Sequence, residues 1–161
     1  MSKKGVILYY TWSGRTQQMA NIISRQTGAK LQEIRPEVPY SENYHTVVSD
    51  AKKEIREGAR PAVQKLACDL SEYDVIYVGT PIWWGTMAPP VATVLSENDL
   101  SEKTMMPFTT HGGGGKGHSD RDIAKLCPHS KVMDMYTAYE GGGKAAEREI
   151  AAWIQQNGLS E

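Results

Sequence analysis

The chain has 161 residues, of which 40% are hydrophobic and 23% charged, and its formal net charge is −1. This length and composition favour one globular domain over residues 1–161. The near-zero charge gives no bulk field toward nucleic acid or an anionic membrane, and no apolar run approaches the roughly 20 residues that span a bilayer. The N-terminus has no signal-peptide pattern, and Cys68 and Cys127 lie far apart. We therefore expect a cytoplasmic protein with reduced thiols.

The first apolar run, Gly5–Tyr10, predicts a strand, and a hydroxyl-rich turn connects it to an amphipathic helix from Thr16 to Gln26. The start of a helix offers unpaired N–H groups and a partial positive charge, so it attracts anions. Glycine lets the backbone approach a ligand, and hydroxyls add hydrogen-bond donors. The turn therefore predicts a phosphate site made of Thr11, Ser13, Gly14, Arg15 and Thr16.

A short, polar second run, Lys30–Ile34, predicts an edge strand. Prolines and polar residues then indicate a loop from Arg35 to Tyr44. A helix is expected from Thr46 to Gly58, because apolar residues recur on one side of it. Those residues are Val47, Val48, Ala51 and Ile55.

The third run, Asp74–Thr80, is nearly continuous in β-branched and aromatic residues, as in a central parallel strand buried on both faces. We expect Pro81 to end it. The loop that follows carries two adjacent tryptophans, and indoles in a surface loop suit the stacking of a flat aromatic ligand. The predicted ring-binding residues are Thr80, Pro81, Ile82, Trp83, Trp84 and Gly85.

Pro89 and Pro90 are placed to open a helix that runs to about Glu97. Thr104–Thr110 predicts the fourth strand, and the glycine-rich loop after it offers backbone N–H groups to the edge of a ring. Its candidate ligand residues are Thr110, His111, Gly112, Gly113, Lys116 and Gly117.

The rest of the chain predicts one more strand between two helices. Ser119 or Asp120 is expected to cap a helix ending near Cys127, and Lys131–Tyr136 predicts the fifth strand. A turn over Gly141–Gly143 leads into a last helix. The residues that this helix is expected to bury are Ala146, Ile150, Trp153 and Ile154.

Strands and helices thus alternate along the whole chain without hairpin signals. This pattern predicts an α/β fold with a five-stranded parallel sheet, doubly wound into three layers by right-handed crossovers. In the order 2-1-3-4-5 the first, third and fourth strands are neighbours, so the three loops that follow them converge at one edge of the sheet. Phosphate donors, a ring-binding loop and backbone donors together outline a site for flavin mononucleotide (FMN).

The chain resembles the flavodoxin family, of the short type, over essentially its whole length. Thr11-x-Ser13-Gly14-x-Thr16 stands where that family has its phosphate loop, and Thr80–Gly85 where it has its first ring-binding loop. The resemblance implies the flavodoxin-like fold, non-covalent FMN and a contribution from Arg15 mainly through its backbone N–H. Because the cofactor performs the redox chemistry, no side-chain nucleophile is expected.

Two classes of redox function are open, and a third class is not redox at all. An electron carrier would exchange electrons with partner proteins, and the plain single-domain size favours it. An FMN oxidoreductase would take hydride from NAD(P)H and reduce a quinone or similar small acceptor. The near-neutral charge and the long segment from Pro39 to Lys65, which is placed to cover the flavin, favour this second class. The third class is a module that binds a phosphate ligand without redox chemistry.

Several residues keep two interpretations. Trp12 suits a ligand contact or a surface or dimer contact, so a monomer and a homodimer are both open. Tyr40 and Tyr44 suit loop packing or a cover for the ring, and His111 suits a ligand contact or a plain loop position. Lys116 would favour an anionic reduced flavin only if its side chain turned inward. The spacing of His111, His118 and His129 is not that of a compact metal site.

Overall fold

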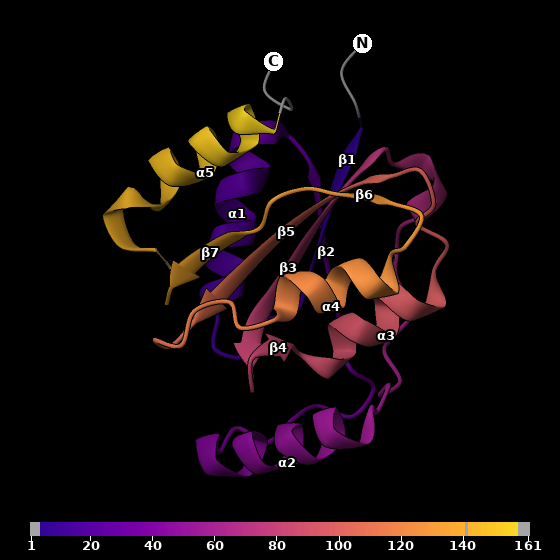
Figure 1. Cartoon of the computed structure of the whole chain (residues 1–161), viewed down its shortest axis with the longest axis vertical. Coiled ribbons are helices and arrows are strands. Elements are labelled where there is room, and N and C mark those ends of the chain that lie inside the picture. The colour runs from indigo at the N-terminus through magenta and orange to yellow at the C-terminus, as the bar shows by residue number, and fades with distance from the viewer. Residues whose placement is uncertain (1–3, 141, 158–161) are drawn as a thin grey trace.

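The computed structural model describes residues 4–140 and 142–157 and shows a twisted, mainly parallel sheet at the centre of the molecule (Figure 1). The strand order is β2-β1-β3-β5-β6, which is the predicted order 2-1-3-4-5. This result confirms the predicted fold class. The bounds are β1 Gly5–Tyr9, β2 Lys30–Glu33, β3 Val75–Trp83, β5 Thr104–His111 and β6 Lys131–Val132.

The fifth strand is not continuous, so the prediction of one strand over Lys131–Tyr136 is wrong. β6 pairs with the start of β5, and a separate strand, β7 (Tyr136–Tyr139), pairs in parallel with its end. Between the two, the carbonyl of Asp134 accepts a hydrogen bond of 2.7 Å from the indole of Trp153. The connecting residues therefore turn toward a helix, and pairing with β5 resumes at Phe108.

β3 does not end at Pro81, because it continues to Trp83 and turns back as a short antiparallel strand, β4 (Thr86–Met87). Both the predicted end and the expected absence of a hairpin are wrong. β1 stops beside Gly79, so Pro81 has a parallel neighbour only on its β5 side, where it is opposite Thr110. Proline is tolerated there because its missing N–H faces no strand.

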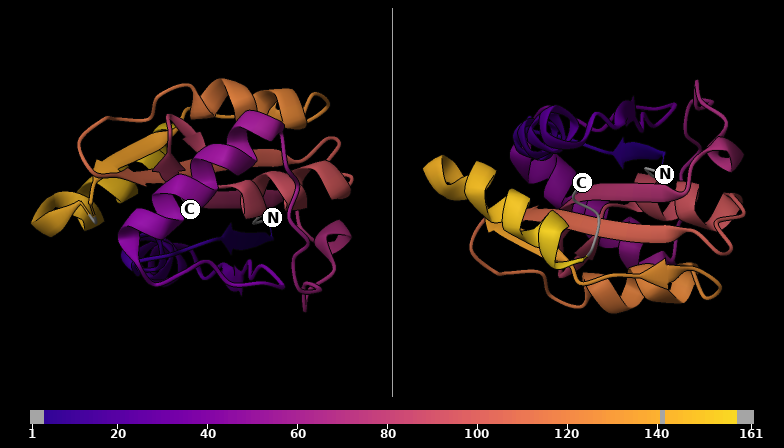
Figure 2. Two further views of the ribbon diagram at one scale, coloured as in Figure 1. Left: turned by 90° about the horizontal axis from the view of Figure 1, so that it is seen from below. Right: turned by 90° about the horizontal axis from the view of Figure 1, so that it is seen from above.

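Four helices cover the two faces of the sheet and make the outer layers (Figures 1 and 2). On one face α1 and α5 pack on Ile7, Tyr77 and Phe108, and on the other α3 and α4 pack on Leu8, Ile76 and Met105. The bounds are α1 Arg15–Thr27, α3 Pro89–Glu97, α4 Ser119–Leu126 and α5 Ala146–Gln156. The four residues expected to be buried in the last helix are all buried.

The helix ends follow the expected signals only in part. α1 ends at Gly28, whose φ of 76° is in the left-handed region that glycine adopts at little cost. α4 begins after His118, and neither Ser119 nor Asp120 caps it, which corrects the predicted cap. The Ser119 hydroxyl instead donates to the carbonyl of Lys116. Of the predicted Gly141–Gly143 turn, Gly141 lies outside the described residues, and a short 3-10 helix, η2, covers Gly143–Ala145.

The fifth helix, α2 (Tyr44–Glu57), covers neither face. It lies across the edge at which the strands end, beyond β4 (Figures 1 and 2). Its N-terminus is capped by Asn43, whose side chain accepts from the N–H of Thr46. An isolated antiparallel bridge between Pro36 and Val63 closes the base of this crossover, and the chain returns to β3 through a second 3-10 helix, η1 (Leu70–Glu72).

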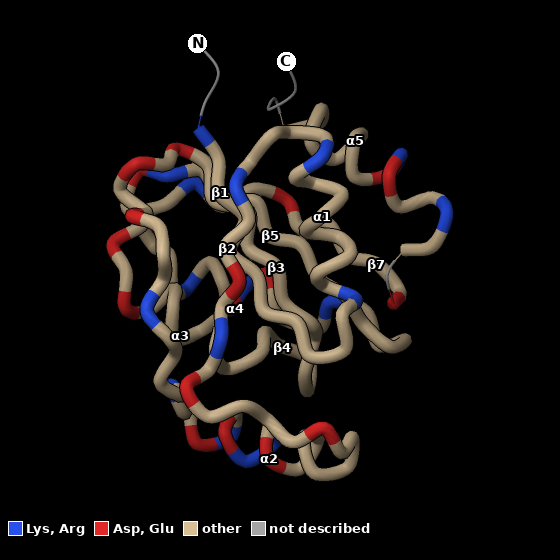
Figure 3. The backbone as a smooth tube through the Cα atoms, turned by 180° about the vertical axis from the view of Figure 1, so that it is seen from behind, with Lys and Arg blue, Asp and Glu red and all other residues tan. Residues whose placement is uncertain are grey.

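Charges lie on the helices, the loops and the edge strands β2 and β6, whereas the central strands β3 and β5 have none (Figure 3). α2 has three acidic and three basic residues, so neither sign dominates on it. Among the described residues, no helix has the length and apolarity that crossing a bilayer requires. The same residues hold no group of three or more His, Cys, Asp or Glu side chains arranged for a metal ion.

Candidate functional site

The three predicted loops meet at one edge of the sheet, and together with α2 they enclose a cavity of about 520 Å³. This volume is in the range of small-molecule sites. Eight predicted site residues lie outside the lining: Thr11, Gly14, Thr16, Thr80, Gly85, Gly113, Lys116 and Gly117. Nine line the cavity: Ser13, Arg15, Pro81, Ile82, Trp83, Trp84, Thr110, His111 and Gly112.

The first loop turns tightly at the N-terminus of α1. Gly14 is the N-terminal cap residue with a φ of 95°, and its N–H donates to the Thr11 hydroxyl at 2.9 Å. This bond shapes the turn so that Ser13 faces the cavity beside the first N–H groups of α1, which have no partner within the helix. The loop thus offers a hydroxyl and helix-end N–H groups to an anion.

Arg15 borders the cavity, and an ion pair ties its charge to Glu140. The guanidinium Nη1 lies 2.9 Å from Oε2 of Glu140, and both side chains are about half exposed. Glu140 directly follows β7 and also lines the cavity. A carboxylate here partly neutralises the charge of Arg15. The attraction of the cavity for an anion therefore depends mainly on the N–H and hydroxyl donors of the turn.

Thr16 connects the first loop to the third. Its hydroxyl lies 3.0 Å from that of Thr110, and both residues are buried, with exposed fractions of 1% and 4%. Because the Thr16 hydroxyl is used in this bond, its side chain holds two loops together at the floor of the site. Its backbone N–H remains at the helix start.

The second loop is the β3–β4 hairpin, and Thr80 stabilises it from behind. The Thr80 hydroxyl donates to the carbonyl of Pro81 at 2.8 Å and accepts from the N–H of Ala88 at 2.9 Å. The side chain is fully buried. Thr80 therefore shapes the loop that presents Ile82, Trp83 and Trp84 to the cavity.

Trp83 is part of an aromatic cluster under the cavity. Its ring makes edge-to-face contacts with Tyr10 at 5.6 Å and with Tyr40 at 5.1 Å. The Tyr40 hydroxyl donates to the Glu54 carboxylate in α2. Burial, reinforced by this bond to a carboxylate, raises the pKa of Tyr40, and burial also raises that of Tyr10. The cluster is thus a neutral, rigid support for Trp83 at neutral pH.

The third loop is organised around His111. The N–H groups of Gly113 and Gly115 both donate to its Nδ1, at 3.0 and 3.2 Å. A nitrogen that accepts two hydrogen bonds carries no proton, so the neutral imidazole holds its proton on Nε2. His111 therefore brings a donor group to the lining of the cavity.

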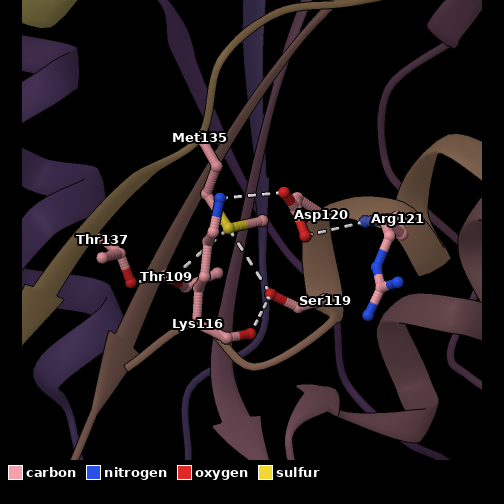
Figure 4. A network of polar contacts seen from close by, with 7 residues as sticks. All are labelled: Thr109, Lys116, Ser119, Asp120, Arg121, Met135 and Thr137. Atoms are coloured by element: carbon pink, nitrogen blue, oxygen red, sulfur yellow. Dashed lines mark hydrogen bonds and ion pairs between the residues drawn. The ribbon is translucent and has the colours of Figure 1, made fainter. Parts of the chain in front are cut away.

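Lys116 is turned away from the cavity and toward Asp120, at a distance of 2.9 Å (Figure 4). Its hydrogen bond lowers the pKa of the Asp120 carboxyl. The inward orientation of Lys116, left open by the sequence, is not the one that the structure shows.

Gly85 and Gly117 contact each other behind the cavity. A Cβ added to Gly117 would lie 2.3 Å from the carbonyl oxygen of Gly85, and the N–H of His118 donates to that same oxygen at 2.7 Å. Glycine at position 117 thus allows the second and third loops to touch.

The sequence predicted that the segment from Pro39 to Lys65 covers the flavin, but it did not identify which of its residues form a wall of the cavity. Val47 and Ala51, the two buried residues of α2, line the cavity together with Val48 and Tyr44. Their apolar stripe predicted a helix with one covered side, but a stripe does not say what covers it. Trp12 also lines the cavity, and its indole donates to the carbonyl of Ser41 at 3.0 Å.

A larger hollow, of about 870 Å³, lies between α1, β7 and the start of α5. Arg15 and Glu140 border both spaces. This hollow is lined mainly by polar and charged groups on the flanks of helices, and only the smaller cavity lies where the three strand ends converge. We therefore assign the candidate site to the smaller cavity.

The fold and the cavity are those of a flavodoxin-like α/β protein, with a site at the carboxyl ends of parallel strands. The chain belongs to the flavodoxin family, whose model matches residues 4–157. No curated protein sequence matches it.

Solved structures show the same architecture. A candidate flavoprotein from Bacteroides eggerthii is 26% identical with a TM-score of 0.85, and the match covers 96% of this chain and 98% of that one. A flavoprotein from Lactobacillus acidophilus in complex with FMN is 25% identical with a TM-score of 0.77, covering 94% of this chain and 99% of that one.

Proposed function

We propose that this protein binds FMN non-covalently in the cavity and acts as a redox protein, with residues 1–161 forming one domain. One observation carries the proposal. The hydroxyl loop at the start of α1 and the tryptophan hairpin open into the same cavity, so a phosphate site and an aromatic ring site lie side by side. Membership of the flavodoxin family and the likeness to an FMN complex support it. Because Cys68 and Cys127 are free thiols, the proposal includes a cytoplasmic setting.

The donor groups of the cavity fit the two ends of FMN. The phosphate would be held by Ser13 and by the N–H groups at the start of α1, in a turn shaped by Thr11 and Gly14. The ring would lie among the hairpin, the third loop and α2, where the lining is mostly apolar or aromatic. The polar end and the apolar end of the cavity thus match the two ends of the cofactor.

Bound FMN supplies reversible one- or two-electron redox chemistry. The residues of this chain position it and control its surroundings. Ile82, Trp83 and the valines of α2 exclude water, which disfavours extra negative charge in the ring region. His111 presents an N–H donor from its Nε2, fixed by two glycine N–H groups at its Nδ1, and so favours a ligand atom that accepts a hydrogen bond.

Two finer functions remain as proposals, and different observations favour them. The plain family architecture favours an electron carrier that exchanges electrons with partner proteins. The placement of α2 across the cavity favours an NAD(P)H-dependent oxidoreductase with a small acceptor, because a helix there limits access to the cofactor.

An absorbance spectrum of the freshly purified protein, followed by an anaerobic reductive titration, tests the shared part of the proposal. We expect a flavin spectrum that bleaches on reduction and returns with oxygen. A colourless protein that does not quench the fluorescence of added FMN would rule the proposal out. Rapid bleaching by NADPH alone would favour the oxidoreductase over the carrier.

A further inference from the structure

Trp84 has a backbone conformation that suits its position in the chain but not its side chain. Trp84 and Gly85 are the two turn residues between β3 and β4, and both have positive φ, 54° and 79°. Two positive φ values define the type I′ hairpin turn, in which Asn-Gly is strongly preferred. Bulky residues other than glycine rarely adopt such values, and those that do often serve a function. An interaction of the Trp84 side chain can offset this strain.

That interaction is with α2. The Trp84 indole donates to the carbonyl of Val48 at 2.9 Å, and the Lys52 ammonium lies 5.0 Å from the centre of its ring. The two partners are four residues apart, one helical turn. Because Trp84 is 50% exposed, the ring does not fill the core. Its contacts join the hairpin of the site to the helix that covers it.

Besides Trp84, side chains that attach α2 to the rest of the molecule are Tyr44, whose ring centre lies 6.2 Å from that of Trp12, and Glu54. The two buried residues of α2, Val47 and Ala51, are 4% and 2% exposed and border the cavity, and the other residues of the helix are half-buried or exposed. The bond from Tyr40 to Glu54 holds the far end of the helix. A helix with so little buried surface depends on specific contacts to keep its place, and Trp84 supplies two of them.

We propose that Trp84 is a positioning residue that holds α2 across the cofactor, and that the covered site serves a small, flat organic acceptor rather than a docked redox protein. The proposal rests on the FMN function proposed above. Tyr44 and Trp84 expose 63% and 50% of their surface at the rim of the cavity, and exposed aromatic rings suit a flat, apolar molecule. The balanced charges of α2 provide no single-sign patch to steer a protein partner.

The electron balance requires a reductant and an acceptor. A reduced nicotinamide dinucleotide gives a hydride, and with one proton from solvent this converts the oxidised cofactor to its two-electron reduced form. A quinone that then leaves as the hydroquinone takes up two electrons and two protons, and the cofactor returns to its oxidised form.

The first experiment measures hydrogen exchange of the α2 amides in the protein without FMN, which keeps it independent of cofactor binding. Asparagine is preferred at this position of the turn, so Trp84→Asn keeps the turn and removes both contacts to α2. Together, one hydrogen bond and one cation–π contact contribute about 1.4 kcal/mol. Their loss should therefore raise the population of a state in which α2 is detached from the hairpin about tenfold. We expect the amides of residues 47–55 to exchange about tenfold faster, with no decrease in the unfolding midpoint.

The matched control is Glu102→Asn. Glu102 is exposed and also has a positive φ, 65°, so the same residue is introduced at a comparable backbone position that does not line the cavity. Exchange in α2 should be unchanged by it. Unaltered α2 exchange in Trp84→Asn, or an equal change in the control, would overturn the role of Trp84.

The second experiment compares two oxidants of the reduced, FMN-loaded protein under anaerobic conditions. Menadione is a small, flat quinone, and cytochrome c is a protein acceptor. We expect menadione to oxidise the wild type faster than cytochrome c does. The ratio of the menadione rate to the cytochrome c rate should fall about tenfold in Trp84→Asn, because α2 is detached more often in this variant. Equal rates in the wild type, or a ratio unaffected by the variant, would overturn the acceptor assignment. A wild type that binds no FMN would overturn the proposed function and the acceptor assignment together, whereas the exchange result alone decides the role of Trp84.

Discussion

α1 and α2 are amphipathic helices of nearly equal length, 13 and 14 residues, and each follows a strand of the parallel sheet. α1 buries four residues, Thr16, Met19, Ala20 and Ile23, and its apolar members pack on the sheet. α2 buries Val47 and Ala51 against a cavity at the edge of the sheet. The same pattern thus serves two purposes. In α1 it stabilises the fold, and in α2 it forms a wall of the site.

The largest expected difference between the two helices is in stability. Ile23 is fully buried, so Ile23→Ala should lower the free energy of unfolding by about 3 kcal/mol. Val47→Ala should lower it by only about 1.5 kcal/mol, because it removes two buried carbons instead of three. FMN affinity should show the reverse order, with the folded Ile23→Ala protein little affected. Urea unfolding and fluorescence titration with FMN measure the two quantities, and an equal loss of stability would remove the distinction.

Breaking the contact between the hairpin and the glycine-rich loop should lower the free energy of unfolding nearly as much as Ile23→Ala does. In Gly117→Ala the new Cβ meets the backbone of Gly85, at a residue with a φ of 58°. Because backbone atoms cannot yield easily, we expect about 2 kcal/mol of destabilisation and a weaker FMN complex. Gly115→Ala is the control in the same loop, since its φ of 74° is similar but its Cβ would meet open space. If the two variants lose the same stability in thermal unfolding, the close contact has no importance of its own.

The bond between Thr16 and Thr110 should contribute less, about 1–2 kcal/mol, because Thr16→Val leaves one buried hydroxyl without its partner. Since this bond shapes the floor of the site, the affinities for FMN and riboflavin should fall by the same factor. Ser13→Ala, by contrast, should weaken FMN more than riboflavin. A double-mutant cycle with Thr110→Val measures the coupling. A selective loss of FMN in Thr16→Val would mean that the hydroxyl contacts the phosphate.

The smallest effect is expected in acid, on the α4 side of the hairpin. Thr86 donates to Oδ2 of Asp122, and Nδ1 of His118 lies 2.6 Å from the same atom. Burial alone would raise the pKa of Asp122, but these bonds outweigh it and hold the pKa below its usual value. The stabilisation is therefore present above the unfolded-state pKa, about 3.9, and is lost as the pH falls through the lower folded-state value. In Asp122→Asn the free energy of unfolding should depend less on pH in the acid range. An unfolding free energy with the same pH dependence as the wild type would count against a stabilising role of the bonds to Asp122.

Much of the fold was predictable from the sequence because it depends on local patterns. The continuous apolar run of β3 and the apolar spacing of α1 identify a buried strand and a helix on its face. The passage of β3 through Pro81 was not predictable in the same way. It depends on where β1 ends beside β3, which is a property of the assembled sheet.

The site was predictable to a similar extent. The loops follow strands, so their meeting place follows from the strand order, and nine of the predicted residues line the cavity. Which side chains face the cavity depends on contacts between distant segments. The Thr16 hydroxyl is turned to Thr110, 94 residues along the chain, and this pairing has no local signal. Lys116 instead pairs with Asp120 four residues on, at a local i,i+4 spacing. The position of α2 is also non-local, since it depends on Trp84 and Tyr40.

Hydrogen exchange with and without saturating FMN tests most directly whether α2 and the three loops form one cofactor site. We expect slower exchange in the first loop, in the hairpin and in residues 44–51 of α2, with no change at the sheet-facing residues 19–23 of α1. Protection confined to the loops, with α2 unchanged, would contradict the claim that this helix is part of the site.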